Sequence, residues 1–222
     1  MSSVIAINQR ARTLEQKAVR RLALLEAAET YFHDVGYEAF SMAQLAKNIG
    51  VAKGTLYLYF ETREELFLTL YEQSLTRWSQ VFISALSESM TSKAYAQALY
   101  LTAIADRTFL PLLIRLEHVI EHNVAIPRLI ESKWEFMRQI EILAGATSTS
   151  LKLGAMQAIE VVKTMGVLLI GATQADQAPL LDNEVLPDDV QALITSFSSE
   201  PLFVKNAVRI IEGIRAEVAS NL

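Results

Sequence analysis

Side chains that can contact DNA lie close together between residues 53 and 59. Lys53, Thr55, Tyr57 and Tyr59 alternate there with small or apolar residues. A lysine can donate to a phosphate or to a base edge, and a hydroxyl group can donate to a phosphate. Packing of an apolar core does not require these residue types. The segment therefore has the chemistry of a DNA-contacting surface, provided that the local structure presents it outward.

Two short helices joined by a tight turn are predicted for residues 41–60. Ser41 and Gln44 have the spacing of a capping box, which satisfies backbone donors at the start of the first helix. Gly50 stands where the chain must take a left-handed turn, a conformation that favours a residue without a Cβ. A second helix starting near Lys53 can lie in a major groove. The same pattern also suits an αα-hairpin within a protein core.

Residues 22–71 resemble the amino-terminal domain of TetR-family transcriptional regulators. The residues that carry the resemblance are AAETYFHDVGYEAFSMAQLAKNIGV, then GTLYLYF at 54–60, then TREELF. The resemblance favours a helix-turn-helix over a core hairpin, and the rest of the chain shares only the family's helical character. It implies an all-α fold, with a three-helix DNA-binding domain at residues 1–65 and a larger helical effector-binding and dimerisation domain at residues 66–222.

The resemblance also assigns roles to residues of the second motif helix and its surroundings. It implies that the hydroxyl groups of Tyr57 and Tyr59 bind phosphates, and that Thr55 lies at the groove. Arg63 stands where the family usually has a phosphate-binding lysine. Leu58 departs from the family pattern, and it either contacts a thymine methyl group or is an exposed apolar residue without a role. The predicted DNA-binding residues are Ser41, Gln44, Lys53, Thr55, Tyr57, Leu58, Tyr59 and Arg63.

The charge of the chain is unevenly distributed. The net charge is −5, but residues 1–63 carry eight Lys/Arg and six Asp/Glu, a net of +2, which leaves −7 for the remainder. A basic arm at the amino terminus consists of Arg10, Arg12, Lys17, Arg20 and Arg21, opposed only by Glu15. Such an arm is either a solvated helix start or, beside a helix-turn-helix, a phosphate-contacting or minor-groove element.

Composition restricts the remaining function classes. The chain has no cysteine, which excludes disulfides and cysteine-based chemistry. Its longest apolar run, residues 164–172, is shorter than the ~20 residues that a membrane span needs, so we expect a soluble, cytoplasmic protein without a membrane partner. We find no nucleophile with a base, no phosphate-binding glycine loop and no clustered carboxylates. The sequence therefore predicts neither an enzyme nor a cofactor.

His118 and His122 have the i, i+4 spacing of a metal site on one helix, with Glu117 and Glu121 beside them. No cysteine or third ligand is evident. A solvated helix face is therefore the favoured interpretation of the pair, and we predict no metal.

The family forms its dimer from the last two long helices, which correspond here to residues 151–172 and 202–218. Small residues in this region would let two helices approach closely, and apolar residues would supply buried area. The predicted dimer-interface residues are Gly154, Ala155, Ala158, Val162, Met165, Leu169, Ile211 and Ile214. Burial within one subunit would explain the same residues.

A small-molecule effector usually binds in the larger domain of the family. The residues that could line its pocket are Trp78, Phe82, Tyr95, Tyr100, Phe109, Trp134 and Met137. Aromatic residues at helical spacing fill cores as readily as they line cavities.

The sequence therefore predicts a ligand-responsive transcriptional regulator, most readily a repressor, that binds a palindromic operator as a homodimer and is released by a small-molecule effector. The alternative is a DNA-binding regulator that is controlled by a protein partner or has no small-molecule effector.

Overall fold

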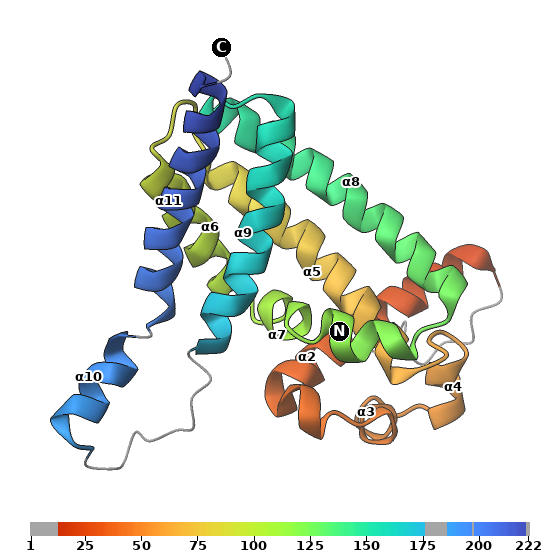
Figure 1. Ribbon diagram of the computed structural model, residues 1–222. Helices are drawn as coiled ribbons and strands as arrows, with labels where there is room; N and C mark the ends of the chain where they lie inside the picture. Colours follow the sequence, from red (N-terminus) through yellow and green to blue (C-terminus); the bar gives the residue numbers. More distant parts are fainter. Residues whose placement is uncertain (1–12, 176–185, 197, 221–222) are drawn as a thin grey trace. The chain divides into compact units, whose positions relative to one another are not determined.

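The computed structural model describes residues 13–175, 186–196 and 198–220, and within these residues the chain forms helices and no strand (Figure 1). The predicted all-α fold is confirmed. The α-helices are α2 (Leu14–Ala39), α3 (Met42–Asn48), α4 (Lys53–Tyr57), α5 (Arg63–Ala85), α6 (Ser92–Ala105), α7 (Phe109–Leu113), α8 (Ile126–Leu151), α9 (Ala155–Ala175), α10 (Asp188–Ser196) and α11 (Ser199–Ser220). Between α7 and α8 lie a π-helical turn, η1 (Leu116–Ile120), and a 3-10 turn, η2 (Glu121–Asn123).

The chain divides into two compact units. Unit 1 combines Met1–Ser74 with Arg107–Lys133, and unit 2 combines Leu75–Asp106 with Trp134–Leu222. The division falls inside α5 and α8. Unit 1 therefore joins the predicted DNA-binding segment to a piece of chain that follows it much later in the sequence. The boundary expected after residue 65 lies within the part of α5 that belongs to unit 1.

Helix α2 begins and breaks where local sequence signals place these events. Thr13 Oγ1 accepts a hydrogen bond from the Gln16 backbone N–H at 3.2 Å, and the Gln16 side chain accepts one from Thr13 N–H, also at 3.2 Å. This reciprocal pair is a complete capping box. Gly36, with φ of +71°, interrupts the helical path near its carboxyl end. Glycine suits this position because a positive φ is strained for residues with a Cβ.

The core of unit 1 is built around Phe67 of α5. The rings of Phe32, Tyr37 and Phe40 lie 5.6, 4.7 and 4.8 Å from the Phe67 ring, measured between centroids. All four residues are buried. Tilted and edge-on aromatic contacts at these distances are favourable, so the cluster fixes the end of α2 on the first turns of α5.

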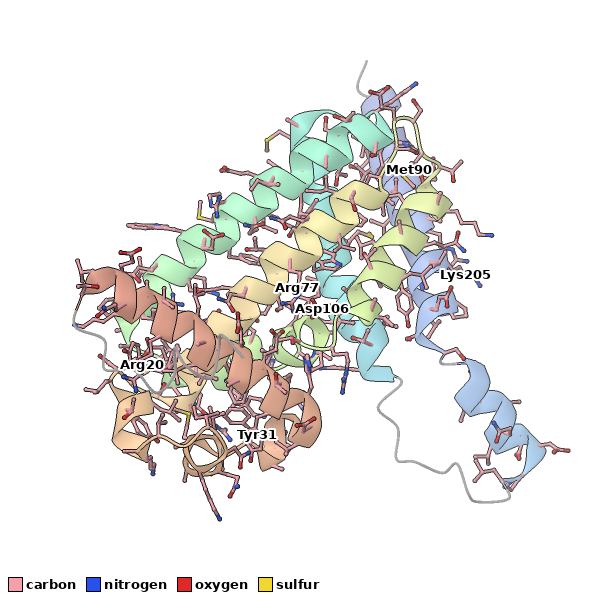
Figure 2. All side chains as sticks on the ribbon, turned by 180° about the vertical axis from the view of Figure 1, so that it is seen from behind. Arg20, Tyr31, Arg77, Met90, Asp106 and Lys205 are labelled. Atoms are coloured by element: carbon pink, nitrogen blue, oxygen red, sulfur yellow. The ribbon has the colours of Figure 1, made fainter. Side chains whose placement is uncertain are left out.

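Unit 2 is a helical bundle in which α11 packs against both α6 and α9. The hydroxyl groups of Tyr95 on α6 and Thr147 on α8 form a buried hydrogen bond of 2.7 Å. Arg77 of α5 forms an ion pair of 2.9 Å with Asp106 at the end of α6, and both residues are labelled in Figure 2. Polar contacts thus add to apolar packing in fixing the order of the helices.

Two helices differ from what the local sequence favours. The small polar residues at 145–150 favour a helix end, but α8 runs through them to Leu151 and the chain turns only at Lys152, whose φ is +53°. Pro111 favours a helix start, but it lies inside α7, and the chain continues as η1 and η2 instead of one long helix. Most of the acidic stretch 173–189 lies outside the described residues.

Within the described part of the chain, one helix, α9, is long and apolar enough to cross a membrane by length and composition alone. A core helix of a soluble protein passes the same test. The inner face of α9 packs on α11, with Ala158, Val161 and Met165 fully buried. The other side of α9 is exposed, and in all 28% of its apolar window is buried.

We expect Gly50→Ala to lower the free energy of unfolding by about 1–2 kcal/mol, because φ at Gly50 is +71° and a side chain there is strained. A Cβ at Gly50 would meet no atom within 4 Å, so the loss would be conformational and not steric. The control is Gly145→Ala, which lies inside α8 with equally open surroundings. It should stabilise the protein by roughly 0.5–1 kcal/mol. Urea unfolding measures both, and equal effects of the two substitutions would contradict the backbone explanation.

Candidate nucleic-acid interface

The first helix of the predicted motif, α3, starts at Ser41 as expected but with half of the predicted capping box. Ser41 Oγ accepts a hydrogen bond from Gln44 N–H at 3.4 Å. The side chain of Gln44 does not return to the Ser41 backbone; its amide nitrogen donates to Asn48 Oδ1 at 2.7 Å, one helical turn further on. Ser41 and Gln44 are both exposed, so their polar atoms lie at the surface of unit 1.

A tight turn leads from α3 to α4. Gly50 has a φ of +71°, the Val51 N–H donates to Ala46 O at 3.0 Å, and the Thr55 N–H donates to Ala52 O at 2.8 Å. The predicted left-handed glycine is therefore present. Helix α4 is only five residues long, which makes its stability dependent on packing.

Two buried side chains anchor α4. Leu56 within it and Phe60 after it have no solvent exposure. The guanidinium carbon of Arg21, on α2, lies 4.9 Å from the centroid of the Phe60 ring. One side of α4 is thereby fixed to unit 1, and the other side is free to face a ligand.

The outward side of α4 carries the residues that the sequence singled out. Lys53 is exposed, Tyr57 is 40% exposed and Leu58 is 83% exposed. Lys53 Nζ lies 5.5 Å from the Tyr57 ring centroid, so the cation and the phenol share one surface. Thr55 and Tyr59 are half-buried at its edges. Neither tyrosine fills the core, and the surface combines a cation, hydroxyl groups and an apolar side chain.

Arg63 is held by the fold rather than extended into solvent. Its Nε lies 2.9 Å from a carboxylate oxygen of Glu64, its guanidinium carbon lies 4.9 Å from the Tyr37 ring centroid, and its terminal nitrogens donate to Phe40 O and to the Tyr37 hydroxyl at 3.5 Å each. Burial raises the pKa of the Tyr37 hydroxyl, and Arg63 opposes that shift only in part. Arg63 thus joins the start of α5 to the end of α2.

The residues of the predicted basic arm lie in different environments. Arg10 and Arg12 lie outside the described residues, and Lys17 is exposed on α2. Arg21 turns inward, where its Nη2 donates to Thr69 Oγ1 at 3.1 Å and burial lowers the pKa of its guanidinium. In unit 1 Arg21 therefore contacts α5 and Phe60.

Arg128, at the start of α8, completes a polar network that sequence reasoning missed. It donates to Thr69 Oγ1 at 3.4 Å and to the carboxylate of Glu72. Burial alone would lower the pKa of Arg128, but the hydrogen bond and charge of Glu72 outweigh burial and raise it. Thr69 is thus shared by Arg21 and Arg128, and the network joins α2, α5 and α8 within unit 1. No local signal predicts it, because its members lie far apart in the sequence.

A second set of contacts joins residues 107–133 to α2. Thr108 Oγ1 donates to a carboxylate oxygen of Glu29 at 2.5 Å and lies 2.8 Å from His33 Nε2. Since the one hydroxyl proton of Thr108 goes to Glu29, His33 Nε2 is the donor in the second bond. Arg115 pairs with Glu38 at 3.3 Å. The carboxyl half of α2 is therefore fixed by residues that follow it by more than seventy positions.

His118 and His122 do not share an α-helical face. His118 lies in the π-helical turn η1 and His122 in the 3-10 turn η2, and both are exposed. The i, i+4 geometry of a metal pair requires an α-helix. Among the described residues, no three or more His, Cys, Asp or Glu side chains form a group that could hold a metal ion.

The residues expected to line an effector pocket fall into two environments. Trp78, Phe82 and Tyr95 are buried in contact, with ring centroids 5.6 Å apart for the first two and 5.4 Å apart for the last two. Tyr100 is also buried and lies against Phe203, with 5.5 Å between ring centroids. Phe109 is buried in unit 1, where it stacks on Tyr71 with centroids 6.1 Å apart. Trp134 and Met137 are instead 68% and 58% exposed on α8.

The residues expected at a dimer interface mostly face the interior of one protomer. Those that are buried are Ala158, Val162, Met165, Leu169, Ile211 and Ile214. They belong to α9 and α11, which pack on each other. Gly154 and Ala155, at the start of α9, are exposed. The outer side of α9 carries other apolar residues, with Met156 79% and Val167 74% exposed.

Comparison with known families agrees with the geometry of α3 and α4. Residues 24–70 match the family of bacterial regulatory proteins named after TetR, and residues 72–218 match the tetracycline-repressor-like C-terminal domain. The chain belongs to the TetR family of transcriptional regulators. The helix-turn-helix is therefore a DNA-binding element, and the two family segments meet inside α5. Residues 107–133, which belong to the C-terminal family segment, lie in unit 1 with the helix-turn-helix.

Three individual relatives have low sequence identity to this chain. The fatty acid metabolism regulator protein of Bacillus subtilis strain 168 is 29% identical over 136 residues, which is 60% of this chain and 64% of that protein. A possible TetR-family regulator from Streptomyces coelicolor A3(2) has a similar structure, with a TM-score of 0.59 and 18% identity over 88% of this chain and 98% of that one. A TetR variant from Acinetobacter baumannii AYE in complex with minocycline gives a TM-score of 0.55 and 14% identity, over 87% and 95% of the two chains. These two structures share the fold.

We expect Arg128→Met to lower the free energy of unfolding by about 2 kcal/mol, because it leaves the carboxylate of Glu72 without its cation in a mostly buried site. The magnitude is below that of a fully buried pair because the two side chains keep 19% and 18% of their exposure. Adding Glu72→Gln should recover part of the loss.

The matched control for this prediction is Arg138→Met, which removes the same cation from an exposed pair with Glu135 and should change stability little. Chemical denaturation of these three variants and the unaltered protein gives the comparison. An Arg128→Met protein as stable as the Arg138→Met protein would contradict the proposed role of the network.

Proposed function

We propose that the protein is a ligand-responsive transcriptional repressor that binds a palindromic operator as a homodimer and is released by a small-molecule effector. The observation that carries the proposal is the outward side of α4, where Lys53, Tyr57 and Leu58 are exposed while Leu56 is fully buried. A helix fixed on one side and polar on the other can enter the major groove.

Each exposed residue of α4 then has a chemical role. Lys53 donates to a phosphate or to a guanine edge. The hydroxyl groups of Tyr57 and Tyr59 donate to phosphates, and Leu58 contacts a thymine methyl group. Ser41, Gln44 and Thr55 border this surface. Arg63 contributes by placing α5, since its guanidinium already contacts Tyr37 and Phe40.

The proposed repression follows from the family. The C-terminal match is to a domain described as tetracycline-repressor-like, and a repressor needs only to occupy its operator. Because the target is DNA, the proposal includes a cytoplasmic location.

Two copies are required because α4 is short. Five helical residues contact too few bases to select one site in a genome, whereas a dimer reads two half-sites. We assign the interface to α9 and α11, with the outer side of α9 at its centre. Met156 and Val167 lie on that side, and exposed apolar residues on one helix face mark an interaction surface. The six buried residues among those predicted from the sequence then support the interface from behind, by holding α9 on α11.

The loss of operator affinity that an effector can cause is limited by how much more tightly it binds one state of the protein than the other. A 100-fold loss of operator affinity requires an effector that prefers the DNA-incompetent state by about 2.7 kcal/mol. The minocycline complex of one structural relative makes a small organic molecule a reasonable effector class.

The alternative, a regulator controlled by a protein partner or without an effector, is favoured by one observation. The rings of Trp78, Phe82 and Tyr95 contact each other in the interior of unit 2, as residues of a filled core do. A screen for small molecules that release the operator distinguishes the two proposals.

We expect Lys53→Ala to weaken binding to an operator selected from random DNA by roughly tenfold, because the substitution removes one cation from the groove-facing side. The slope of log affinity against log salt should fall by about 0.9 if Lys53 contacts a phosphate. Fluorescence anisotropy at several salt concentrations measures both. Lys93→Ala, which removes an equal charge from unit 2, is the control, and equal losses in the two variants would remove α4 from the interface.

We expect Val167→Asp to convert the dimer to monomers at micromolar concentration, because a charge would be buried at the centre of the outer α9 side. Operator affinity should fall with it. Leu101→Asp, at a residue of α6 that is 53% exposed, is the control and should remain dimeric. Sedimentation velocity distinguishes the species, and a dimeric Val167→Asp protein would place the interface elsewhere.

A further inference from the structure

Helix α10 is a short helix with exposed apolar residues. It has nine residues and begins with Asp188 and Asp189. Two of its apolar side chains are exposed, Val190 to 37% and Leu193 to 59%. Helices shorter than about 12 residues are marginal in water, and most of their stability in proteins comes from packing of an apolar side. Helix α10 therefore needs a surface that covers Val190 and Leu193.

A groove of about 480 Å³ lies along α6 and α11 in unit 2. Its apolar lining comes from Pro201, Val204 and Val208, which recur on one side of α11. Lys205 also lines it, and Figure 2 shows this residue on the outer side of α11. The groove has the apolar character that a short helix needs for packing.

The charge of the groove is positive. Lys93, Lys205 and Arg209 line it together with one carboxylate, that of Glu200. Among the described residues, no carboxylate forms a salt bridge with any of these three cations. A positive apolar groove in a chain of net charge −5 is complementary to an acidic amphipathic helix.

The connection between α10 and α11 allows α10 to reach this groove. Helix α10 ends at Ser196 and α11 begins at Ser199, and connections of two to five residues join antiparallel helices in αα-hairpins. At ~1.5 Å per residue, α10 and the groove side of α11 from Pro201 to Arg209 each span about 12 Å. Folded back along α11, α10 would bring Leu193 level with Val204.

The same arrangement pairs the charges. At about 100° per residue, Asp189 lies on the same side of α10 as Val190 and Leu193, while Gln191 lies on the opposite side. Asp189 would then stand level with Lys205 and Arg209.

We propose that the groove on α6 and α11 is the docking surface for α10 of the same chain, with Val190 and Leu193 on its apolar lining and Asp189 beside Lys205 and Arg209. The exposed helix and the open groove described above are the undocked arrangement. Docking covers both apolar surfaces and places a carboxylate beside two cations of the groove.

Cysteine cross-linking tests the proposal, since the chain contains no cysteine and an engineered pair is the sole source of disulfide. In the full-length protein, Leu193→Cys with Val204→Cys should form an intrachain disulfide roughly tenfold faster than Gln191→Cys with Val204→Cys, because a docked pair has the higher effective concentration. The control has a tether only two residues longer and presents its thiol on the opposite side of α10. Adding Asp189→Lys to the Leu193→Cys pair should slow the reaction, and adding Arg209→Glu to that variant should restore it.

Three outcomes would overturn the proposal. Equal rates for the two pairs would mean that α10 has no preferred face toward α11. A disulfide between two chains, seen as a dimer on a non-reducing gel, would assign the groove to α10 of a second copy. Equal rates together with binding of dodecanoate that Arg209→Glu abolishes would make the groove a site for a small anionic amphiphile.

Discussion

Helix α4 is too short to be stable by itself, and the DNA-binding surface depends on how it is anchored. A five-residue helix has very few internal backbone hydrogen bonds, so its conformation depends on tertiary contacts. Burial of Leu56 and Phe60 supplies these contacts, and the left-handed turn at Gly50 fixes the angle at which α4 leaves α3. Because the anchoring side is fully buried, the opposite side holds its exposed residues in a defined arrangement.

The anchor of α4 is in turn connected to the rest of unit 1. Arg21 stacks on Phe60 and bonds to Thr69, and Thr69 also accepts a hydrogen bond from Arg128. Arg128 belongs to the C-terminal family segment, as do Thr108 and the other residues that hold the carboxyl half of α2. A displacement of the first turn of α8 would therefore change contacts that end at the base of α4. This is a physical route by which an event in the C-terminal segment could alter DNA binding.

Local features of the structure could be predicted from the sequence, whereas long-range features could not. The sequence could predict the positive φ angles of Gly36 and Gly50 and the helix start at Ser41. Glycine adopts positive φ without strain, and serine is a preferred residue at helix starts. The exposure of one side of α4 could be predicted because its polar residues are unsuited to a protein core. The shared Thr69 network had no such signal, since an arginine that pairs 59 residues away resembles any surface arginine.

Helix ends and the burial of side chains were harder to predict where the residue types suit more than one environment. The run 145–150 contains small polar residues typical of a connection, yet Thr147 is fully buried and bonded to Tyr95, so tertiary contacts extend α8 through it. Trp134 and Met137 have the residue types of a core or pocket but are exposed on α8.

The composition of unit 1 has a practical consequence for work with hybrid regulators. A hybrid of two relatives made with a single crossover at the junction of the two family segments would be joined between residues 70 and 72. A crossover at this point would separate Glu29 and His33 from Thr108, and Glu38 from Arg115. The unit that has to be transferred intact is therefore discontinuous in sequence. A hybrid that keeps residues 107–133 together with the amino-terminal helices would preserve the contacts that support its DNA-binding helices.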